Sequence, residues 1–205
     1  MPRVLEKKER SLGTKLSIRG DRANSPKSAL TRKPYKPGQH GKRFSKLSEF
    51  GTQLQEKQKI KFSYGVSDKQ LKKIFQSAAG RKGTSAIDAI TSVLERRLDN
   101  VVMRLGFAPS RSVARQMISH GHFLVNSRKV NTPSYTVKEG DIISIKPASV
   151  GLRIFEDLKD SLKKYEAPSW LSVDAESLKG EVKSAPKDVD FPFNINLVVD
   201  YYSKK

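Results

Sequence analysis

The stretch 85–145 constrains the fold most, because its apolar pattern changes from helical to strand-like. From Ser85 to Leu105 the apolar residues share one broad helical face, with room for a break, and polar residues fall opposite. The apolar positions are Ile87, Ile90, Val93, Leu94, Leu98, Val101 and Leu105, and the polar ones are Asp88, Ser92, Glu95, Arg96 and Asp99. The spacing therefore predicts a long amphipathic helix whose polar face meets solvent.

A second helix is predicted from Ser110, a suitable N-cap after Pro109, to Gly121, a suitable C-terminal cap. Its residues divide between two arcs at 100° per residue. The apolar arc holds Val113, Ala114, Met117 and Ile118, and the polar arc holds Ser112, Arg115, Gln116 and Ser119. The apolar arc is expected to pack against the first helix.

Short strands follow this helix. HFLV and RKVN, joined through Asn126 and Ser127, predict a small hairpin that Pro133 ends. SYTV and DIISIK, with EGD between them, predict another strand pair. The stretch 93–150 is therefore expected to be an α+β module of two helices and a small antiparallel sheet.

The segment 47–92 predicts a helical domain. Ser67 and Gln70 fit a capping box that opens a helix, and Gly65 and Gly80 sit where C-terminal caps belong. Three lysines before Gly65 spread around the preceding helix and are candidates for binding a polyanion: Lys57, Lys59 and Lys61. Their alternative interpretation is ordinary solvated surface.

The segment 151–205 begins with helical spacing over 152–165. At its end, NINLVVDYYSKK leaves helix and strand open, because Val198 and Val199 favour a strand while Asn194 could cap a helix.

The charge is large and unevenly distributed. The formal net charge is +19, of which residues 1–46 carry +11, whereas residues 150–205 carry −1. Such a surplus repels itself unless a polyanion neutralises it, so nucleic acid is the first candidate partner and an anionic membrane the second. No apolar run approaches the ~20 residues of a spanning helix, which disfavours the membrane. The absence of cysteine excludes disulfides and thiolate metal sites.

The segment 1–46 is expected to be a basic arm with little intrinsic structure. Pro34, Pro37, Gly38 and Gly41 interrupt regular elements, and apolar residues are too sparse for a separate core. We expect the arm to become ordered against a partner; the alternative is a solvated disordered tail. MPRVLEKKER has no apolar signal core, and its glutamates argue against a transit peptide, so the cytosol is the expected compartment.

The arginines of the two predicted helices lie on the borders of their apolar faces. Arg97 and Arg104 are seven residues apart, and Arg111 and Arg115 are four apart. A guanidinium is a planar fork that grips phosphate oxygens in two places, so these borders predict a phosphate-binding edge. Residues at the helix end and hairpin extend it: His120, His122, Asn126, Arg128 and Lys129. The alternative is solvated arginine, which helix borders favour anyway.

Several ordered stretches resemble a known family. ERRLDNVVMRLGFAPSRSVARQMISHGHFLVNSRKVNTPSYTVKEGDIISI is similar to the S-four RNA-binding domain, also called the αL motif. PGQHGKR, SEFGTQLQEKQKIKFSYGVSDKQLKKIF and the terminal YYSKK resemble the bacterial small-subunit ribosomal protein S-four family. The resemblance covers roughly Arg32 to Lys205.

This resemblance implies an αL module inserted into a helical domain, so that 47–92 and 151–205 pack together. It implies direct, early binding of small-subunit rRNA at a multi-helix junction, which nucleates assembly of the subunit body. It also implies proteins S three and S five as neighbours, a place near the mRNA entrance channel, an effect on translational accuracy and, in some members, binding of the protein's own mRNA leader. The RNA-facing positions carried over by the match are Arg97, Arg104, Arg111, Arg115, His120, His122 and Lys129, with Gln39, His40, Lys42 and Arg43 in the arm.

The chain departs from that family in three places. Many members carry a four-cysteine zinc cluster near the N-terminus; here no zinc or other cofactor is expected, and the first ~30 residues need another source of order. Asn126 and Ser127 replace the usual Asn-Gly of the hairpin, and DFPFNIN before the tail is unusual.

An RNA-modifying enzyme is the rival interpretation, because the αL motif also occurs in pseudouridine synthases and Arg97-Leu98-Asp99 mimics their catalytic RLD. The sequence opposes it. Asp99 lies inside the module, too few residues follow Val150 for a catalytic domain of ~100–200 residues, and a charge partner such as Arg96 explains the Asp more simply. His120 and His122 have no third ligand nearby, and Gly121 breaks their strand geometry, so no metal is expected.

Overall fold

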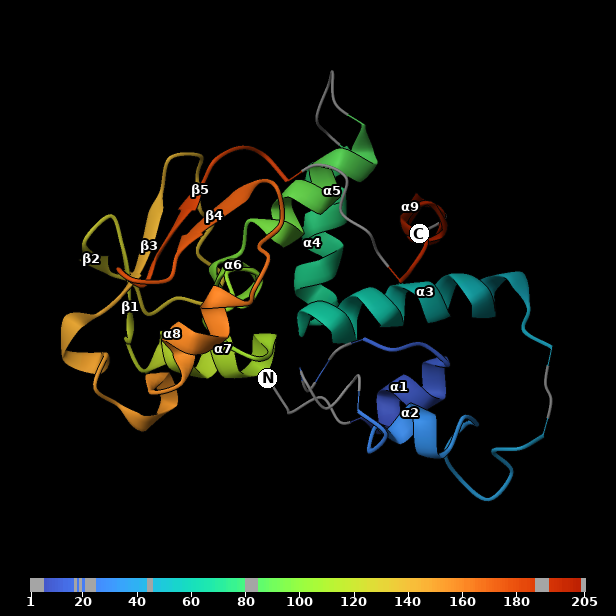
Figure 1. Cartoon of the computed structure of the whole chain (residues 1–205). Coiled ribbons are helices and arrows are strands. Elements are labelled where there is room, and N and C mark those ends of the chain that lie inside the picture. Colours follow the sequence, from blue (N-terminus) through green and yellow to red (C-terminus); the bar gives the residue numbers. More distant parts are fainter. Residues whose placement is uncertain are drawn as a thin grey trace. The chain divides into compact units, whose positions relative to one another are not determined.

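The computed structural model describes residues 6–16, 18, 20, 25–43, 46–79, 85–186 and 192–203. The chain forms two compact units (Figure 1). Unit 1 comprises Met1–Ile90 and Val189–Lys205, and unit 2 comprises Thr91–Asp188. The predicted α+β class is confirmed by the helices and the antiparallel sheet of the described residues.

Unit 2 is built around one five-stranded antiparallel sheet of order β2-β1-β3-β5-β4. Its strands are β1 (Phe123–Val125), β2 (Arg128–Lys129), β3 (Ile142–Ile145), β4 (Leu171–Asp174) and β5 (Lys179–Val182). Its helices are α6 (Leu98–Arg104), α7 (Arg111–Ser119) and α8 (Leu158–Lys163), and α5 (Ala86–Glu95) crosses the boundary between the units. The core joins helical Leu98, Leu105 and Ile118 to Phe123 and Ile143 of the sheet, all fully buried.

The predicted break in the first helix is confirmed, between α5 and α6. Arg97 is extended, with φ −70° and ψ 136°, and it forms a β-bridge with Thr136. The NH of Leu98 donates to Tyr135 O at 2.8 Å, and the NH of Val137 donates to Arg96 O at 2.9 Å. The predicted pairing of SYTV with DIISIK is therefore wrong, because SYTV satisfies the backbone groups that the helix break leaves without helical partners.

The predicted hairpin is confirmed as a two-residue turn between β1 and β2. Asn126 has φ 48° and Ser127 has φ 65°, the left-handed conformations that such a turn requires. Predicted caps are also confirmed on α7, where Ser110 Oγ accepts from the NH of Val113 at 3.4 Å and Gly121 follows the helix with φ 77°.

The segment 151–205 is divided differently from the expectation that it returns whole to the helical domain. Residues 151–188 belong to unit 2, where β5 pairs with β3 and β4 pairs with β5. Two features of β5 explain why this segment joins unit 2. Its alternate side chains are buried in the core, and its backbone pairs with the otherwise open edge of β3. A Cβ on Gly180 of β5 would lie 2.5 Å from Leu105 Cδ2, so the strand passes closely over α6. The helix predicted over 152–165 is reduced to a 3₁₀ turn, Arg153–Phe155, and α8.

Unit 1 contains α1 (Lys7–Leu12), α2 (Ala29–Arg32), α3 (Glu49–Tyr64), α4 (Asp68–Ala79) and α9 (Ile195–Ser203). The capping box of α4 is confirmed, because Ser67 Oγ accepts from the NH of Gln70 at 3.2 Å and the Gln70 side chain accepts from the NH of Ser67 at 3.1 Å. Gly65 ends α3 with φ 59° as predicted, while the predicted cap at Gly80 lies outside the described residues.

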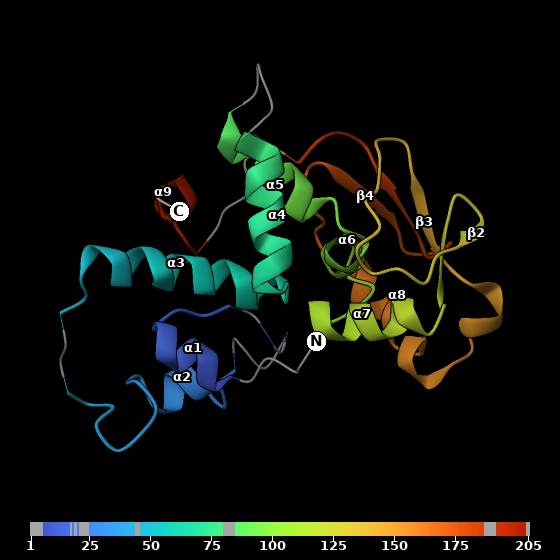
Figure 2. The same cartoon turned by 180° about the vertical axis from the view of Figure 1, so that it is seen from behind.

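The tail left open by its sequence is helix α9, which lies beside α3 in both views (Figures 1 and 2). Asn194 Oδ1 accepts from the NH of Asn196 at 3.0 Å, so the Asn caps the helix start. The Asn194 NH donates in turn to Glu56 Oε2 of α3 at 2.8 Å. Burial of Ile195, Val198 and Tyr201 on one face outweighs the strand preference of the valines.

The arm contains more structure than expected. Glu9 is 2% exposed, and its Oε1 accepts from the backbone NH of Leu16 at 2.9 Å and of Ile18 at 3.4 Å. Leu12, Leu16 and Ile18 form a small apolar cluster against Phe62 of α3. The buried carboxylate of Glu9 and the apolar cluster packed against α3 are therefore the source of order in this cysteine-free segment.

Candidate nucleic-acid interface

The four arginines of the predicted edge converge on three buried polar residues of unit 2. Glu95, Asp99 and Asn100 are 0%, 1% and 0% exposed. The helix break brings the end of α5 against the start of α6, and α7 packs along α6. We call the arginines Arg97, Arg104, Arg111 and Arg115 the arginine edge, and Glu95, Asp99 and Asn100 its buried anchor.

Asp99 holds two of these arginines. Arg97 donates from Nε to Asp99 Oδ1 at 3.1 Å and from Nη2 to Oδ2 at 2.9 Å. Arg115 donates from Nε to the same Oδ2 at 3.1 Å. Arg96, the charge partner expected for Asp99, instead donates from Nε to Val137 O at 2.7 Å, so that expectation is wrong.

Glu95 and Asn100 hold the other two arginines. Arg104 donates from Nε to Glu95 Oε2 at 3.2 Å and from Nη2 to Oε1 at 3.3 Å. Asn100 Nδ2 donates to Glu95 Oε2 at 2.8 Å, and Asn100 Oδ1 accepts from Arg111 Nε at 2.8 Å. Each arginine of the edge therefore has a defined orientation before any partner arrives.

The buried anchor was missed by sequence reasoning, which placed Glu95 and Asp99 on a solvated polar face. Helix α5 ends at Glu95 and helix α6 begins at Leu98, so Glu95 and Asp99 do not lie on one continuous polar face. Both side chains are therefore covered. The sequence does contain a signal for burial: two acidic residues lie within a few positions of several arginines, and buried carboxylates require paired charges.

The arrangement leaves positive charge at the surface. The anchor contains two carboxylates for the four guanidinium groups of the edge, and the side chains of Arg104 and Arg115 are 27% and 28% exposed. Arg97 is 8% exposed and serves first as a structural partner of Asp99. Asp99 itself is buried and accepts hydrogen bonds from Arg97 and Arg115, so its carboxylate is not presented at the surface.

The hairpin candidates occupy different environments. His120 is exposed, whereas His122 is half-buried with Nδ1 3.0 Å from Ser149 Oγ. Arg128 and Lys129 are exposed on the edge strand β2. Within the described ranges, no group of three or more His, Asp and Glu side chains is arranged to hold a metal ion.

Asn126 serves the turn. Its Nδ2 donates to Asp141 Oδ1 at 2.7 Å, and its Oδ1 accepts from the NH of Ile142 at 2.9 Å. The side chain thus connects the hairpin to the start of β3. A contact with nucleic acid, as predicted for Asn126, would have to compete with these two hydrogen bonds.

The α3 lysines form ion pairs within unit 1. Lys57 Nζ lies 2.7 Å from Asp68 Oδ1, Lys61 pairs with the other oxygen of Asp68, and Lys59 Nζ lies 2.6 Å from Glu56 Oε1. Burial alone would raise the pKa of Asp68, but the hydrogen bonds from Lys57 and Lys61 outweigh it and lower that pKa below its ordinary value. The three lysines are therefore neither independent nor simply solvated.

The arm candidates lie in unit 1, in a turn-rich segment after Tyr35. Four of them are exposed there: Gln39, His40, Lys42 and Arg43. The NH of Arg43 donates to His40 O at 3.0 Å, and Lys42 Nζ lies 5.5 Å from the centre of the Tyr35 ring. The segment presents two cations and two polar side chains on a defined backbone. None of the helices in the described part of the chain is long and apolar enough to cross a membrane.

Comparison with known families gives two adjacent matches. Residues 96–143 match the family described as S4 domain, and residues 5–95 match the family described as Ribosomal protein S4/S9 N-terminal domain. The S4 match begins at the helix break and includes the arginine edge from Arg97 to Arg115. The fold and the site thus define an RNA-binding ribosomal protein that carries an S4 domain.

Full-length relatives agree with this class. The chain is 48% identical to the small ribosomal subunit protein uS4 of Caldicellulosiruptor bescii and 46% identical to that of Halothermothrix orenii. Both alignments cover 94% of this chain and 93% of the relative. The chain belongs to the small ribosomal subunit protein uS4 family. The resemblance seen in the sequence is thereby confirmed, and the protein is a structural, non-enzymatic constituent of the cytoplasmic ribosome.

Proposed function

We propose that this uS4 chain binds small-subunit rRNA directly through the arginine edge, early in assembly, and so nucleates the subunit body. The observation that carries the proposal is the buried anchor. Asp99, Glu95 and Asn100 fix the orientation of all four arginines. The side chains of Arg104 and Arg115 are partly exposed, so their guanidinium groups remain accessible at the surface.

Such an arrangement suits phosphate binding. Immobilising a long side chain on association costs about 0.5–1.5 kcal/mol, and much of that cost is already met when the side chain is held in the free protein. A fixed, planar guanidinium also places two N–H donors side by side, where they can bind two oxygens of one phosphate. We therefore propose recognition of RNA mainly by shape and phosphate positions, with base edges contributing less.

The further placement of the chain in the ribosome is proposed from its family membership. We propose that it adjoins proteins S3 and S5, lies near the mRNA entrance channel and influences translational accuracy. The exposed arm residues Gln39, His40, Lys42 and Arg43 supply a second basic segment for such contacts. A misreading assay with ribosomes carrying Lys42→Ala and Arg43→Ala tests the accuracy proposal, since unchanged misreading would oppose it.

The direct test compares binding of a small-subunit rRNA fragment over a salt series. Arg111→Ala with Arg115→Ala should weaken binding by at least about tenfold at low salt. It should also reduce the salt slope by about two, because each arginine that neutralises a phosphate contributes about one to that slope. Lys163→Ala with Lys164→Ala removes the same charge from exposed positions elsewhere in unit 2 and should change binding little.

Arg115 also contributes to the fold, so the variant needs a second control. Replacing both arginines by lysine keeps the charge but removes the planar fork, and should restore the salt slope without restoring full affinity. Equal binding by the alanine variant and the wild type would contradict the proposal. Competition by the protein's own mRNA leader would measure whether the same surface serves a regulatory RNA.

A further inference from the structure

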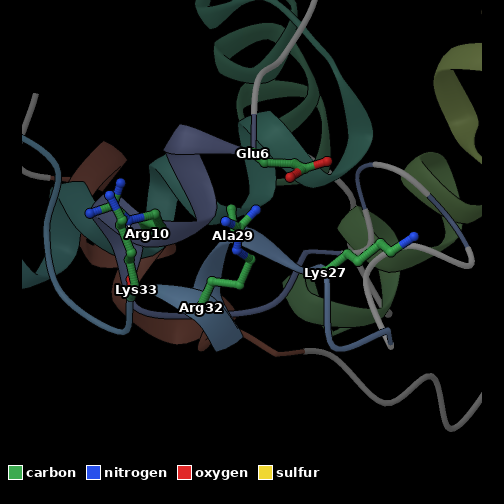
Figure 3. Close-up of a pocket in the computed structure, with 6 residues that line it drawn as sticks. All are labelled: Glu6, Arg10, Lys27, Ala29, Arg32 and Lys33. Carbon is green, nitrogen blue, oxygen red and sulfur yellow. Dashed lines mark hydrogen bonds between the residues drawn. The ribbon is translucent and has the colours of Figure 1, made fainter.

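Unit 1 contains a basic hollow that the arginine edge does not use (Figure 3). Its volume is about 210 Å³, and its lining comes from three segments of the arm. Glu6 is the N-cap of α1 and Arg10 lies in its last turn, Lys27 comes from the turn before α2, and Ala29, Arg32 and Lys33 come from α2 and its end. In Figure 3, Arg10 and Lys33 lie at one side, Lys27 at the other, and Arg32 between them.

The charges of this hollow are unbalanced. Four of its six lining residues are cations, and Glu6 is the one acidic residue among the six. Cations brought together by the fold repel one another unless an anion neutralises them. Glu9, the next acidic side chain along the chain, is buried and engaged with the backbone NH of Leu16 and Ile18. Its carboxylate is therefore already engaged, and Glu9 is not among the lining residues of the hollow.

One cation of the hollow is held in place. Arg10 donates from Nε to Lys33 O at 3.1 Å and to Tyr35 O at 3.2 Å, and its guanidinium lies 5.2 Å from the centre of the Tyr35 ring. These contacts connect α1 to the end of α2 and fix the guanidinium at the side of the hollow. A preorganised guanidinium binds an oxyanion with less loss of side-chain entropy than a mobile one.

We infer that this hollow is a binding site for one phosphate group, formed by Arg10, Lys27, Arg32 and Lys33. A volume of about 210 Å³ leaves room for a phosphate group or a diphosphate with some of its hydration. A phosphate dianion would offset most of the net positive charge of the lining. Two guanidinium groups can bind its oxygens in pairs, and the negative charge of Glu6 in the lining weakens rather than prevents binding.

The phosphate can belong to the RNA backbone or to a free phosphate compound, and the test separates the two sources. The inference rests on the proposed function only where RNA is the source. Its variants lie in unit 1, so its result is independent of the Arg111 and Arg115 variants in unit 2.

The first arm titrates the full chain with inorganic pyrophosphate, followed by phosphorus NMR or calorimetry. Lys27→Ala with Arg32→Ala should weaken binding about tenfold or more, because it removes two charge-assisted contacts from exposed side chains. Lys72→Ala with Lys73→Ala removes the same charge from exposed positions on α4 and should leave binding within about twofold, since distant exposed charges are screened. Glu6→Gln should tighten binding several-fold.

The second arm measures the rRNA fragment with the same variants. If RNA supplies the phosphate, Lys27→Ala with Arg32→Ala weakens RNA binding more than the α4 control does, and pyrophosphate competes for the site. If a free phosphate compound is the ligand, pyrophosphate binding depends on Lys27 and Arg32 while RNA binding matches that of the control. Behaviour identical to the α4 control in both arms overturns the inference, provided that thermal unfolding shows each variant folded.

Discussion

Arg115 on α7 donates from Nε to the carboxylate of Asp99 on α6 at 3.1 Å, and Asp99 is only 1% exposed. Because the same carboxylate also accepts from Arg97, one buried group joins the helix break to the second helix of the module. This contact serves two purposes, since it stabilises the packing of α6 with α7 and it orients a surface guanidinium.

Replacing Asp99 should damage both stability and binding. Asp99→Asn leaves the buried guanidinium of Arg97 without its charge partner, and removal of one member of a buried pair costs about 3–5 kcal/mol. Urea unfolding should show a free energy of unfolding lowered by that amount, whereas Glu139→Gln in an exposed turn should not change it. An unchanged value for Asp99→Asn would mean that Arg97 and Arg115 find other acceptors.

Glu9 should control the order of the arm. Glu9→Ala removes the acceptor of two buried backbone NH groups, which costs about 1–3 kcal/mol for a group left unsatisfied. Hydrogen exchange should accelerate at Leu16 and Ile18, while amides of β1 and β3 in unit 2 stay protected. Glu9→Gln keeps one acceptor oxygen and should show a smaller effect. Equal exchange in all three proteins would oppose this origin of order.

The Asp68 ion pairs predict a pH dependence of stability. The pKa of Asp68 is lowered in the folded protein from its ordinary value of 3.8, so the stabilisation is present above about that pH and is lost as the pH falls through the folded value. The side chain is half exposed, so solvent screening limits the effect to about 1 kcal/mol.

Denaturant unfolding of wild type and Asp68→Asn tests this dependence. The difference between their free energies of unfolding should be largest near neutral pH and shrink below about pH 4, and about 1 M salt should reduce it. A difference that stays constant down to about pH 2.5 would assign the effect to something other than the charge of Asp68.

The hairpin turn should be improvable by glycine. Ser127 adopts φ 65°, where glycine is favoured, so Ser127→Gly should raise the free energy of unfolding by about 0.5–1 kcal/mol. The same substitution at Ser112, an exposed position in α7, should lower it by about 0.5 kcal/mol, because glycine is a poorer helix former. Thermal unfolding of both variants measures the two signs, and equal signs would contradict the argument.

Local sequence signals were sufficient for several elements. Ser67 and Gln70 predicted the start of α4, Ser110 predicted the start of α7, and Asn126 and Ser127 predicted a two-residue turn; the structure confirms all three. These features depend on side chains that bond backbone groups two or three residues away, or on backbone conformations of single residues. Their information is contained within a short window of sequence.

Other elements required partners distant in the chain. SYTV pairs with the helix break instead of the next strand, and β5 completes a sheet that begins more than fifty residues earlier, at Phe123. Helix or strand at Val198 was decided by burial against α3. In each case the deciding term is tertiary contact, which local propensity does not contain.

The sequence by itself determined the basic character of the protein, the α+β module, its family and the four arginines of the edge, because charge, periodicity and ordered motifs are properties of the linear chain. Only the tertiary structure decided what holds those arginines. Glu95 and Asp99 look solvated on a continuous helix, but the break after Glu95 and the packing of α7 bury both. Buried carboxylates must be paired, and that requirement orders the surface that meets the RNA in the proposed function.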